Sequence, residues 1–184
     1  MKHIEIKIGG FGGQGIVLSG FIMGKAASIY DKKNATLTQS YGPESRGGAC
    51  SAQLIVSEEE VDYPEVQKPE ILMVISQEAY EKFTPCLIKG GILLYDEDLV
   101  NSVNNLPKKT RIYSIPATRF AEELGRKIVT NIIMLGFFTA ITSVISYESM
   151  KKSVLSSIPA GTEELNLKAF QKGYEFGLEK VKGM

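Results

Sequence analysis

The sequence predicts an α/β fold, in which a doubly wound, mostly parallel sheet carries helices on both faces. Short apolar runs alternate with segments of helical length along most of the chain, and this alternation is typical of a parallel sheet covered by helices. The first apolar run leads directly into a glycine-rich turn, as at a strand-to-helix junction. With 184 residues the chain has enough length for one full core and little for two, so we expect a single domain over residues 1–184.

The first half of the chain contributes three predicted strands and one helix. Segment 4–8 alternates apolar with charged residues, and segment 35–39 is the second strand. Segment 50–56 alternates small or apolar residues with polar ones, which predicts a half-buried strand, and the acidic run 58–60 is expected to be an exposed turn. A helix is predicted over 16–29, with its packing face formed by Ile16, Leu18, Ile22, Met23, Ala26 and Ala27.

The second half continues the alternation. Segment 71–75 is a continuous apolar run, typical of a central parallel strand, and 92–95 and 111–115 are predicted as further strands. Helices are expected over 77–83, ended by Pro85, over 117–124, and as two segments after residue 147, the last over 163–181.

One segment of the second half carries no charged side chain from residue 128 to 147. A helix over its 18 residues 128–145 would be about 27 Å long, slightly less than the core of a bilayer. A membrane span is one interpretation, although polar residues dilute the segment and no basic flank marks a cytoplasmic side. We favour burial between the sheet and a second subunit, because helices that are apolar on nearly all sides are usually buried. The isolated chain is therefore expected to self-associate.

Composition excludes several classes of function. Lys and Arg together number 21, as do Asp and Glu, so no net charge attracts nucleic acid or an anionic membrane. Two cysteines, Cys50 and Cys86, are too few for an iron–sulfur cubane, and His3 is the only histidine, so neither a His-based triad nor a zinc site is supported. We expect no catalytic residue and no metal site in this chain, and a reducing cytoplasm as its compartment.

The first candidate ligand site is the glycine-rich turn 9–15, where Gly10, Gly12 and Gly15 have the G-x-G-x-x-G spacing. Glycine allows φ > 0 and a close approach of backbone N–H groups to an anion, and the following helix directs its partly positive end there. A nicotinamide site also needs an acidic residue at the end of the second strand. Residues 38–40 are Thr-Gln-Ser instead, which argues against NAD. A tight turn without a ligand is the other interpretation.

A second glycine-rich loop covers residues 40–48, with the sequence Ser-Tyr-Gly-Pro-Glu-Ser-Arg-Gly-Gly. Arg46 is a planar donor of permanent charge, and Gly47 and Gly48 leave it accessible. We expect it to bind a ligand or to lie in a subunit interface. The alternative is a surface turn initiated by Pro43.

These motifs resemble those of the gamma subunit of 2-oxoacid:ferredoxin (or acceptor) oxidoreductases. Segments 61–64, 68–70, 130–131 and 135–136 follow in the family's order, so the resemblance covers nearly the whole chain. The second loop is most similar to the short gamma subunits of 2-oxoglutarate-type enzymes. The residues expected to contact a ligand are Gly10, Gly12, Gly13, Gln14, Gly15, Ser40, Tyr41, Gly42, Arg46, Gly47 and Asn131.

The resemblance implies a division of labour within a complex. Such a complex oxidatively decarboxylates a 2-oxoacid with coenzyme A, giving an acyl-CoA, CO2 and reduced ferredoxin. Thiamine diphosphate and Mg belong to the alpha and beta subunits, and the iron–sulfur clusters to other chains, including a ferredoxin-like delta subunit. The gamma subunit is Rossmann-like, packs on the catalytic subunits near coenzyme A and is inactive alone. The alternative function is a stand-alone nucleotide- or flavin-binding Rossmann-like protein.

Overall fold

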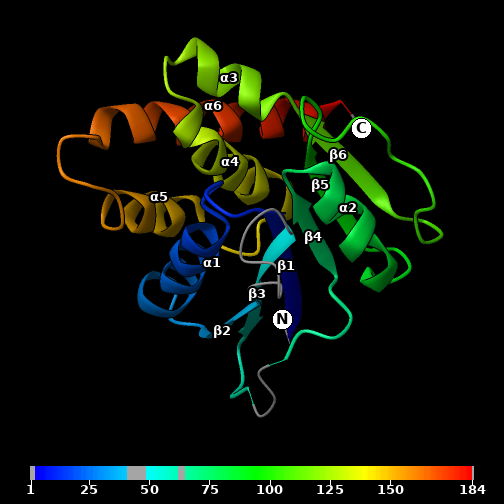
Figure 1. Cartoon of the computed structure of the whole chain (residues 1–184). Coiled ribbons are helices and arrows are strands. Elements are labelled where there is room, and N and C mark those ends of the chain that lie inside the picture. Colours follow the sequence, from blue (N-terminus) through cyan, green and yellow to red (C-terminus); the bar gives the residue numbers. More distant parts are fainter. Residues whose placement is uncertain (1–2, 41–48, 62–64, 184) are drawn as a thin grey trace.

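The computed structural model describes residues 3–40, 49–61 and 65–183, and a six-stranded sheet lies at its centre (Figure 1). The strand order is β2-β3-β1-β4-β5-β6. Strands β1, β4, β5 and β6 are parallel neighbours, whereas β3 is antiparallel to both β1 and β2. The strands are β1 (Ile4–Phe11), β2 (Asn34–Ser40), β3 (Ala49–Ser57), β4 (Ile71–Val74), β5 (Ile92–Asp96) and β6 (Arg111–Ile115).

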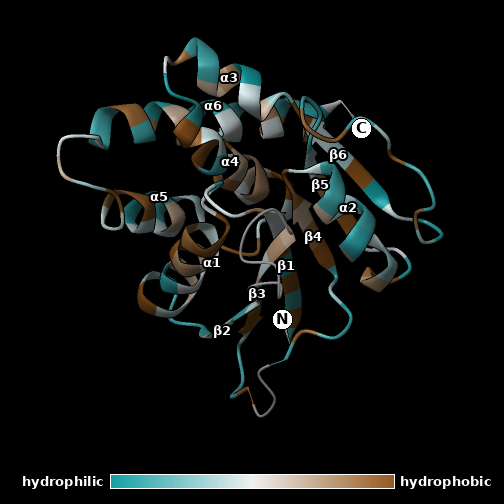
Figure 2. Ribbon diagram, in the orientation of Figure 1, coloured by the Kyte–Doolittle hydropathy of each residue, from teal (hydrophilic) through white to brown (hydrophobic). Residues whose placement is uncertain are grey.

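Helices cover both faces of the sheet. One buried cluster lies beneath α2, and a larger one lies between the other face and the remaining helices. Figure 2 shows hydrophobic colouring through β4 and α4 and hydrophilic colouring on much of α3. The expected α/β fold with a mostly parallel sheet is confirmed. The helices are α1 (Ile16–Lys25), continued by a π-helical turn (Ala26–Tyr30), α2 (Gln77–Phe83), α3 (Ala117–Glu123), α4 (Thr130–Thr142), α5 (Tyr147–Leu155) and α6 (Glu163–Lys182).

Two predictions about burial were wrong. Strand β3 was expected to be half-buried, yet Ser51 and Ser57 are buried together with its apolar residues. The strand lies inside the sheet, with α1 packed on it, and Glu78 of α2 accepts a hydrogen bond from the backbone N–H of Ala49 at its start. Serine is small enough to be covered on such a strand. Conversely, Leu18 was placed on the packing face of α1 but is 37% exposed.

Helix α4 is buried by the chain itself. Its residues 131–140 are all buried, between the sheet and α6, which lies along it (Figure 1). The two helices touch through glycine: a Cβ on Gly136 would overlap the Phe170 carbonyl oxygen, and one on Gly173 would overlap the Ile133 carbonyl oxygen. The expected cover by a second subunit was therefore wrong, because α6 provides the cover.

The burial of α4 also bears on the two other predictions made for this segment, self-association and a membrane span. Self-association of the isolated chain stays a prediction, but α4 no longer supports it. Among the helices of the described ranges, none has the length and apolar character needed to cross a membrane.

The close approach of α4 and α6 generates a stability prediction for Gly173→Ala. Overpacking a core costs about 1–3 kcal/mol, and the added methyl would overlap a helix backbone that cannot move aside. We expect the free energy of unfolding to fall by the upper end of this range, despite the better helix propensity of alanine. Urea denaturation followed by circular dichroism measures the change.

Gly183→Ala is the matched control at the end of the same helix. A Cβ there would lie 3.6 Å from the Glu179 carbonyl oxygen, an ordinary contact, so we expect a change within about 0.5 kcal/mol. Equal stability of the two variants would contradict the proposed role of Gly173 in helix packing.

Candidate functional site

The glycine-rich turn lies between two neighbouring strands whose following connections lead to opposite sides of the sheet. After β1 the chain passes through α1 to β2 on one side, and after β4 it passes through α2 to β5 on the other. Strands β1 and β4 are parallel neighbours, so their carboxyl ends meet at this point. In open α/β sheets, ligands bind in the crevice at such a topological switch point.

Different structural constraints favour glycine at the individual positions of the turn. Gly13 and Gly15 have φ angles of 90° and 74°, which other residues rarely adopt, and Gly15 is the N-cap of α1. Gly10 belongs to β1, and a Cβ on it would lie 2.7 Å from Oε1 of Gln14. Gly12 is different, since its φ is not positive and a Cβ would meet none of the described residues within 4 Å.

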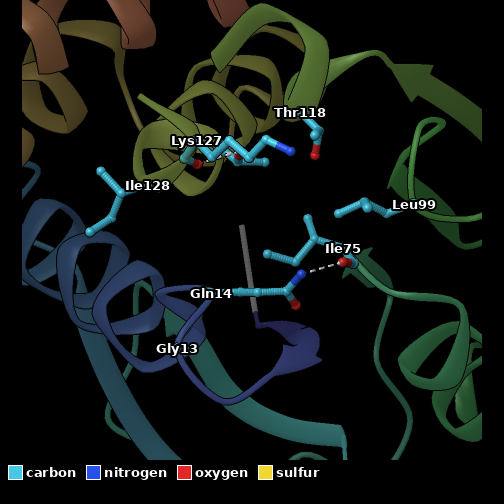
Figure 3. Close-up of a pocket in the computed structure, with 8 residues that line it drawn as sticks. Gly13, Gln14, Ile75, Leu99, Thr118, Lys127 and Ile128 are labelled. Atoms are coloured by element: carbon cyan, nitrogen blue, oxygen red, sulfur yellow. Dashed lines mark hydrogen bonds between the residues drawn. The ribbon is translucent and has the colours of Figure 1, made fainter. Parts of the chain in front are cut away.

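The side chain of Gln14 joins the ends of two strands. Its Oε1 accepts a hydrogen bond from the backbone N–H of Phe11 at 2.6 Å. Its Nε2 donates to the carbonyl oxygen of Ile75 at 3.1 Å (Figure 3). The backbone N–H of Ile75 in turn donates to the carbonyl oxygen of Gly9 at 3.0 Å. Both polar atoms of the amide are therefore bonded to the protein backbone.

Asn131 reaches the same turn from α4. Its side chain is buried, and Nδ2 donates to the carbonyl oxygen of Gly15 at 3.4 Å. A Cβ on Gly15 would overlap the Asn131 side chain, so glycine also allows α4 to approach the start of α1. The structure thus brings together the predicted site residues of the first loop and Asn131, although they are far apart in sequence.

A cavity of about 350 Å³ opens beside this turn. Its walls come from the carboxyl ends of β1, β4 and β5 and from the starts of α3 and α4. In Figure 3 the side chains of Thr118 and Lys127 lie across the cavity from Gln14. The lining residues are Gly13, Gln14, Ile75, Leu99, Thr118, Lys127, Ile128 and Thr130.

Two polar side chains of the cavity wall are held by carboxylates. Oδ2 of the buried Asp96 accepts from the backbone N–H of Thr118 at 3.0 Å and from its hydroxyl at 2.6 Å. Burial raises the pKa of Asp96, while the hydrogen bonds from Thr118 oppose the shift. Lys127 is exposed and lies 2.6 Å from Glu122, whose hydrogen bond raises the pKa of the lysine. Lys127 therefore stays protonated at neutral pH and lies at the rim as an ion pair with Glu122.

A second cavity of about 410 Å³ lies next to the first. Ile128 lines both cavities and is 77% exposed. The second cavity has mainly apolar walls from α1, the start of α4 and the segment between α5 and α6. Its lining residues are Leu18, Arg126, Ile128, Val129, Asn131, Ile132, Ile158, Pro159, Gly161, Thr162, Leu165 and Asn166.

Sequence reasoning missed Thr118, Lys127 and Ile128. None of them belongs to a motif, and Ile128 was counted only as part of an apolar helix. A usable signal was present, because Thr118 lies in the first turn of the helix that follows a predicted parallel strand, and the segments after the carboxyl ends of such strands meet at one edge of the sheet.

The second predicted loop is described only at its first residue. Ser40 ends β2 and is exposed, and it lies opposite Ser51, which also lies opposite Gly9 of β1. The chain therefore enters this loop at the same edge of the sheet as the glycine turn. Ser40 lines neither of the two cavities. The other predicted contacts of this loop lie outside the described residues, and their role stays a prediction: Tyr41, Gly42, Arg46 and Gly47.

Metal-ligating side chains do not gather in the part of the chain that the structure describes. No group of three or more His, Cys, Asp or Glu residues there could hold a metal ion. Cys50 is buried, and burial raises the pKa of its thiol, whereas Cys86 is exposed.

Several known proteins are similar to this chain in fold and sequence. A family model described as pyruvate ferredoxin/flavodoxin oxidoreductase matches residues 5–176. The 2-oxoglutarate synthase subunit KorC of Methanocaldococcus jannaschii is 52% identical over 177 residues, which cover 95% of this chain and 94% of that one. The crystal structure of a keto/oxoacid ferredoxin oxidoreductase gamma subunit from Geobacter sulfurreducens PCA has a TM-score of 0.86 at 42% identity, covering 96% of this chain and 99% of that one.

A more distant structure shares the fold. The 2-oxoglutarate:ferredoxin oxidoreductase from Magnetococcus marinus, solved with 2-oxoglutarate, coenzyme A and succinyl-CoA bound, has a TM-score of 0.86 at 23% identity. The match covers all of this chain and 32% of that one. The family model and the close relative extend over almost the whole sequence and confirm the resemblance of the motifs. This chain belongs to the pyruvate ferredoxin/flavodoxin oxidoreductase family.

Proposed function

We propose that this chain is the gamma subunit of a 2-oxoacid:ferredoxin oxidoreductase that acts on 2-oxoglutarate. The 52% identical relative is a subunit of 2-oxoglutarate synthase, whereas the pyruvate synthase subunit PorC of the same organism is 28% identical. This difference favours 2-oxoglutarate over pyruvate. The complex would convert the 2-oxoacid and coenzyme A into an acyl-CoA, CO2 and reduced ferredoxin.

Within this complex the chain would bind and position rather than carry out the chemistry. The full sequence has two cysteines and one histidine, too few for a cluster that takes four thiolates. We therefore assign the iron–sulfur clusters, thiamine diphosphate and Mg to partner subunits: alpha, beta and a ferredoxin-like delta chain. The glycine turn and its cavity are the part of this chain that we assign to coenzyme A.

The observation that carries this assignment is the open position of Gly12. Nothing among the described residues requires glycine there, whereas a ligand that approaches the turn closely would. Phosphate groups suit the backbone N–H groups of such a turn and the N-terminus of α1. The ammonium group of Lys127, paired with Glu122, lies at the rim of the same cavity. Ile75, Leu99 and Ile128 offer apolar contacts to a less polar part of the ligand.

The size of the cavity agrees with a shared site. At about 350 Å³ it lies near the lower end of the range for ligand cavities. We infer that it holds part of coenzyme A and that a facing subunit holds the rest. The exposed side chain of Ile128 would then lie where ligand and partner meet.

The partnership can be tested by gentle purification from the native source. We expect the chain to elute with alpha and beta subunits, and with a ferredoxin-like subunit where the organism has one. The assembly should reduce a viologen dye in the presence of 2-oxoglutarate and coenzyme A, and much more slowly with pyruvate. Elution of the chain alone from native extract would contradict the proposal.

The purified chain by itself distinguishes the proposal from a stand-alone flavin-binding protein. We expect it to be colourless and inactive, because the flavin and clusters that absorb visible light would be absent. Absorbance spectra and metal analysis measure this directly. Stoichiometric flavin, iron or thiamine diphosphate in the pure chain would favour the alternative.

Arg46→Ala tests the contribution of the second loop to coenzyme A binding. A charge-assisted hydrogen bond contributes about 1.5–3 kcal/mol, so the KM for coenzyme A should rise roughly 10- to 150-fold, while that for 2-oxoglutarate stays nearly constant. Steady-state kinetics of the reconstituted complex give both values. Arg111→Ala is the control, since Arg111 is an exposed arginine at the amino end of β6, at the opposite edge of the sheet. Unchanged kinetics for Arg46→Ala would limit this residue to a structural role.

A further inference from the structure

The turn that lines the cavity is tied to two other parts of the chain. On one side Gln14 connects it to Ile75, which follows β4, and on the other Asn131 of α4 connects to Gly15. The turn is therefore held between the two strands of the switch point and the first turn of α4. Both ties are made by side-chain amides that bond to backbone atoms.

Of the two amides, that of Gln14 bears on the cavity directly. It lines the cavity, whereas Asn131 is buried and lines only the neighbouring one. Its Oε1 accepts from the N–H of Phe11, the last residue of β1. The N–H of Ile75 donates to the carbonyl oxygen of Gly9, so the N–H of Phe11, two residues further along β1, also faces the β4 side and not β3. Its protection from solvent exchange therefore reports on the bond to Gln14.

We propose that Gln14 is a positioning residue, which holds the ligand-free glycine turn in the conformation that accepts coenzyme A. This inference rests on the function proposed above. Glycine makes the turn able to adopt positive φ but also leaves it with many accessible conformations. A turn that is already held in its bound conformation loses less conformational entropy on binding, and this gain appears as affinity. The amide thus offsets the freedom that Gly12 and Gly13 introduce.

The inference differs from a direct ligand contact in a measurable way. A residue that only contacts the ligand leaves the empty turn unchanged when it is replaced. A positioning residue alters the turn before any ligand is present, and then weakens binding. Because the ligand itself also orders the turn once it is bound, KM should change more than kcat.

The experiment compares three variants of the full chain without coenzyme A, by amide hydrogen exchange followed by NMR. Gln14→Met keeps the length of the side chain and removes both bonds. Gln14→Glu keeps an acceptor for the N–H of Phe11 but loses the donor to the Ile75 carbonyl. Ile128→Ala is the matched control, since it alters the same cavity wall and, within the described residues, makes no side-chain hydrogen bond to the turn.

We expect the Phe11 amide to exchange about tenfold faster or more in Gln14→Met, and to stay protected in Gln14→Glu and Ile128→Ala. The amides of the β4–β5 pair should keep their wild-type rates in all three variants, which shows that the change is local. In the reconstituted complex, Gln14→Met should raise the KM for coenzyme A about tenfold and leave kcat and the KM for 2-oxoglutarate within about twofold.

Wild-type protection of Phe11 in Gln14→Met would overturn the inference. It would also be overturned if exchange rises while the KM for coenzyme A stays the same. In that second case Arg46→Ala tests the function proposed above separately: if Arg46→Ala raises this KM, the chain still binds coenzyme A through its second loop, and it is the role of Gln14 that fails. If neither variant changes it, the proposed coenzyme A site itself has failed.

Discussion

The backbone contact between α4 and α6 is the constraint on which the candidate site depends. Gly136 and Gly173 let the two helices touch where any side chain would overlap a carbonyl oxygen. The contact buries α4 almost completely between α6 and the sheet. It also holds α4 against the rest of the chain, and the segment at the start of α4, with Lys127, Ile128 and Thr130, forms one wall of the cavity.

The candidate site is formed by segments that follow the carboxyl ends of the parallel strands. Parallel strands bring the segments that follow β1, β4 and β5 to one edge, and the reversal of strand order opens a crevice there. Polar groups near the crevice are satisfied within the chain: Asp96 holds Thr118, and Gln14 and Asn131 hold the turn. Gly12 has neither a positive φ nor a neighbour among the described residues that would require glycine, which is why the ligand was assigned there.

Much of this could be predicted from the sequence because the signals are local. Each predicted strand and helix is present, since apolar runs and helical segments depend on neighbouring residues, and the central strand 71–75 and the helix 77–83 match β4 and α2 closely. The glycine spacing correctly located a turn with positive φ at Gly15. The two loop motifs identified the family, because a motif of such length and specificity can be recognised from the sequence without knowledge of the fold.

The remaining features were decided by tertiary structure, because they depend on which distant segments meet. An apolar helix indicates burial but not what covers it, and here α6 takes the place that was assigned to a second subunit. The antiparallel direction of β3 and the burial of its serines follow from its place inside the sheet. That Gln14 and Asn131 contact a ligand stays a prediction, but the structure adds that their amides bond to the backbone of Ile75 and Gly15. The sequence by itself determined the elements, the turn and the family. Only folding determined the partner of each amide: Gln14 and Ile75 are separated by 61 positions, and Asn131 and Gly15 by 116, so neither hydrogen bond leaves a local pattern in the sequence.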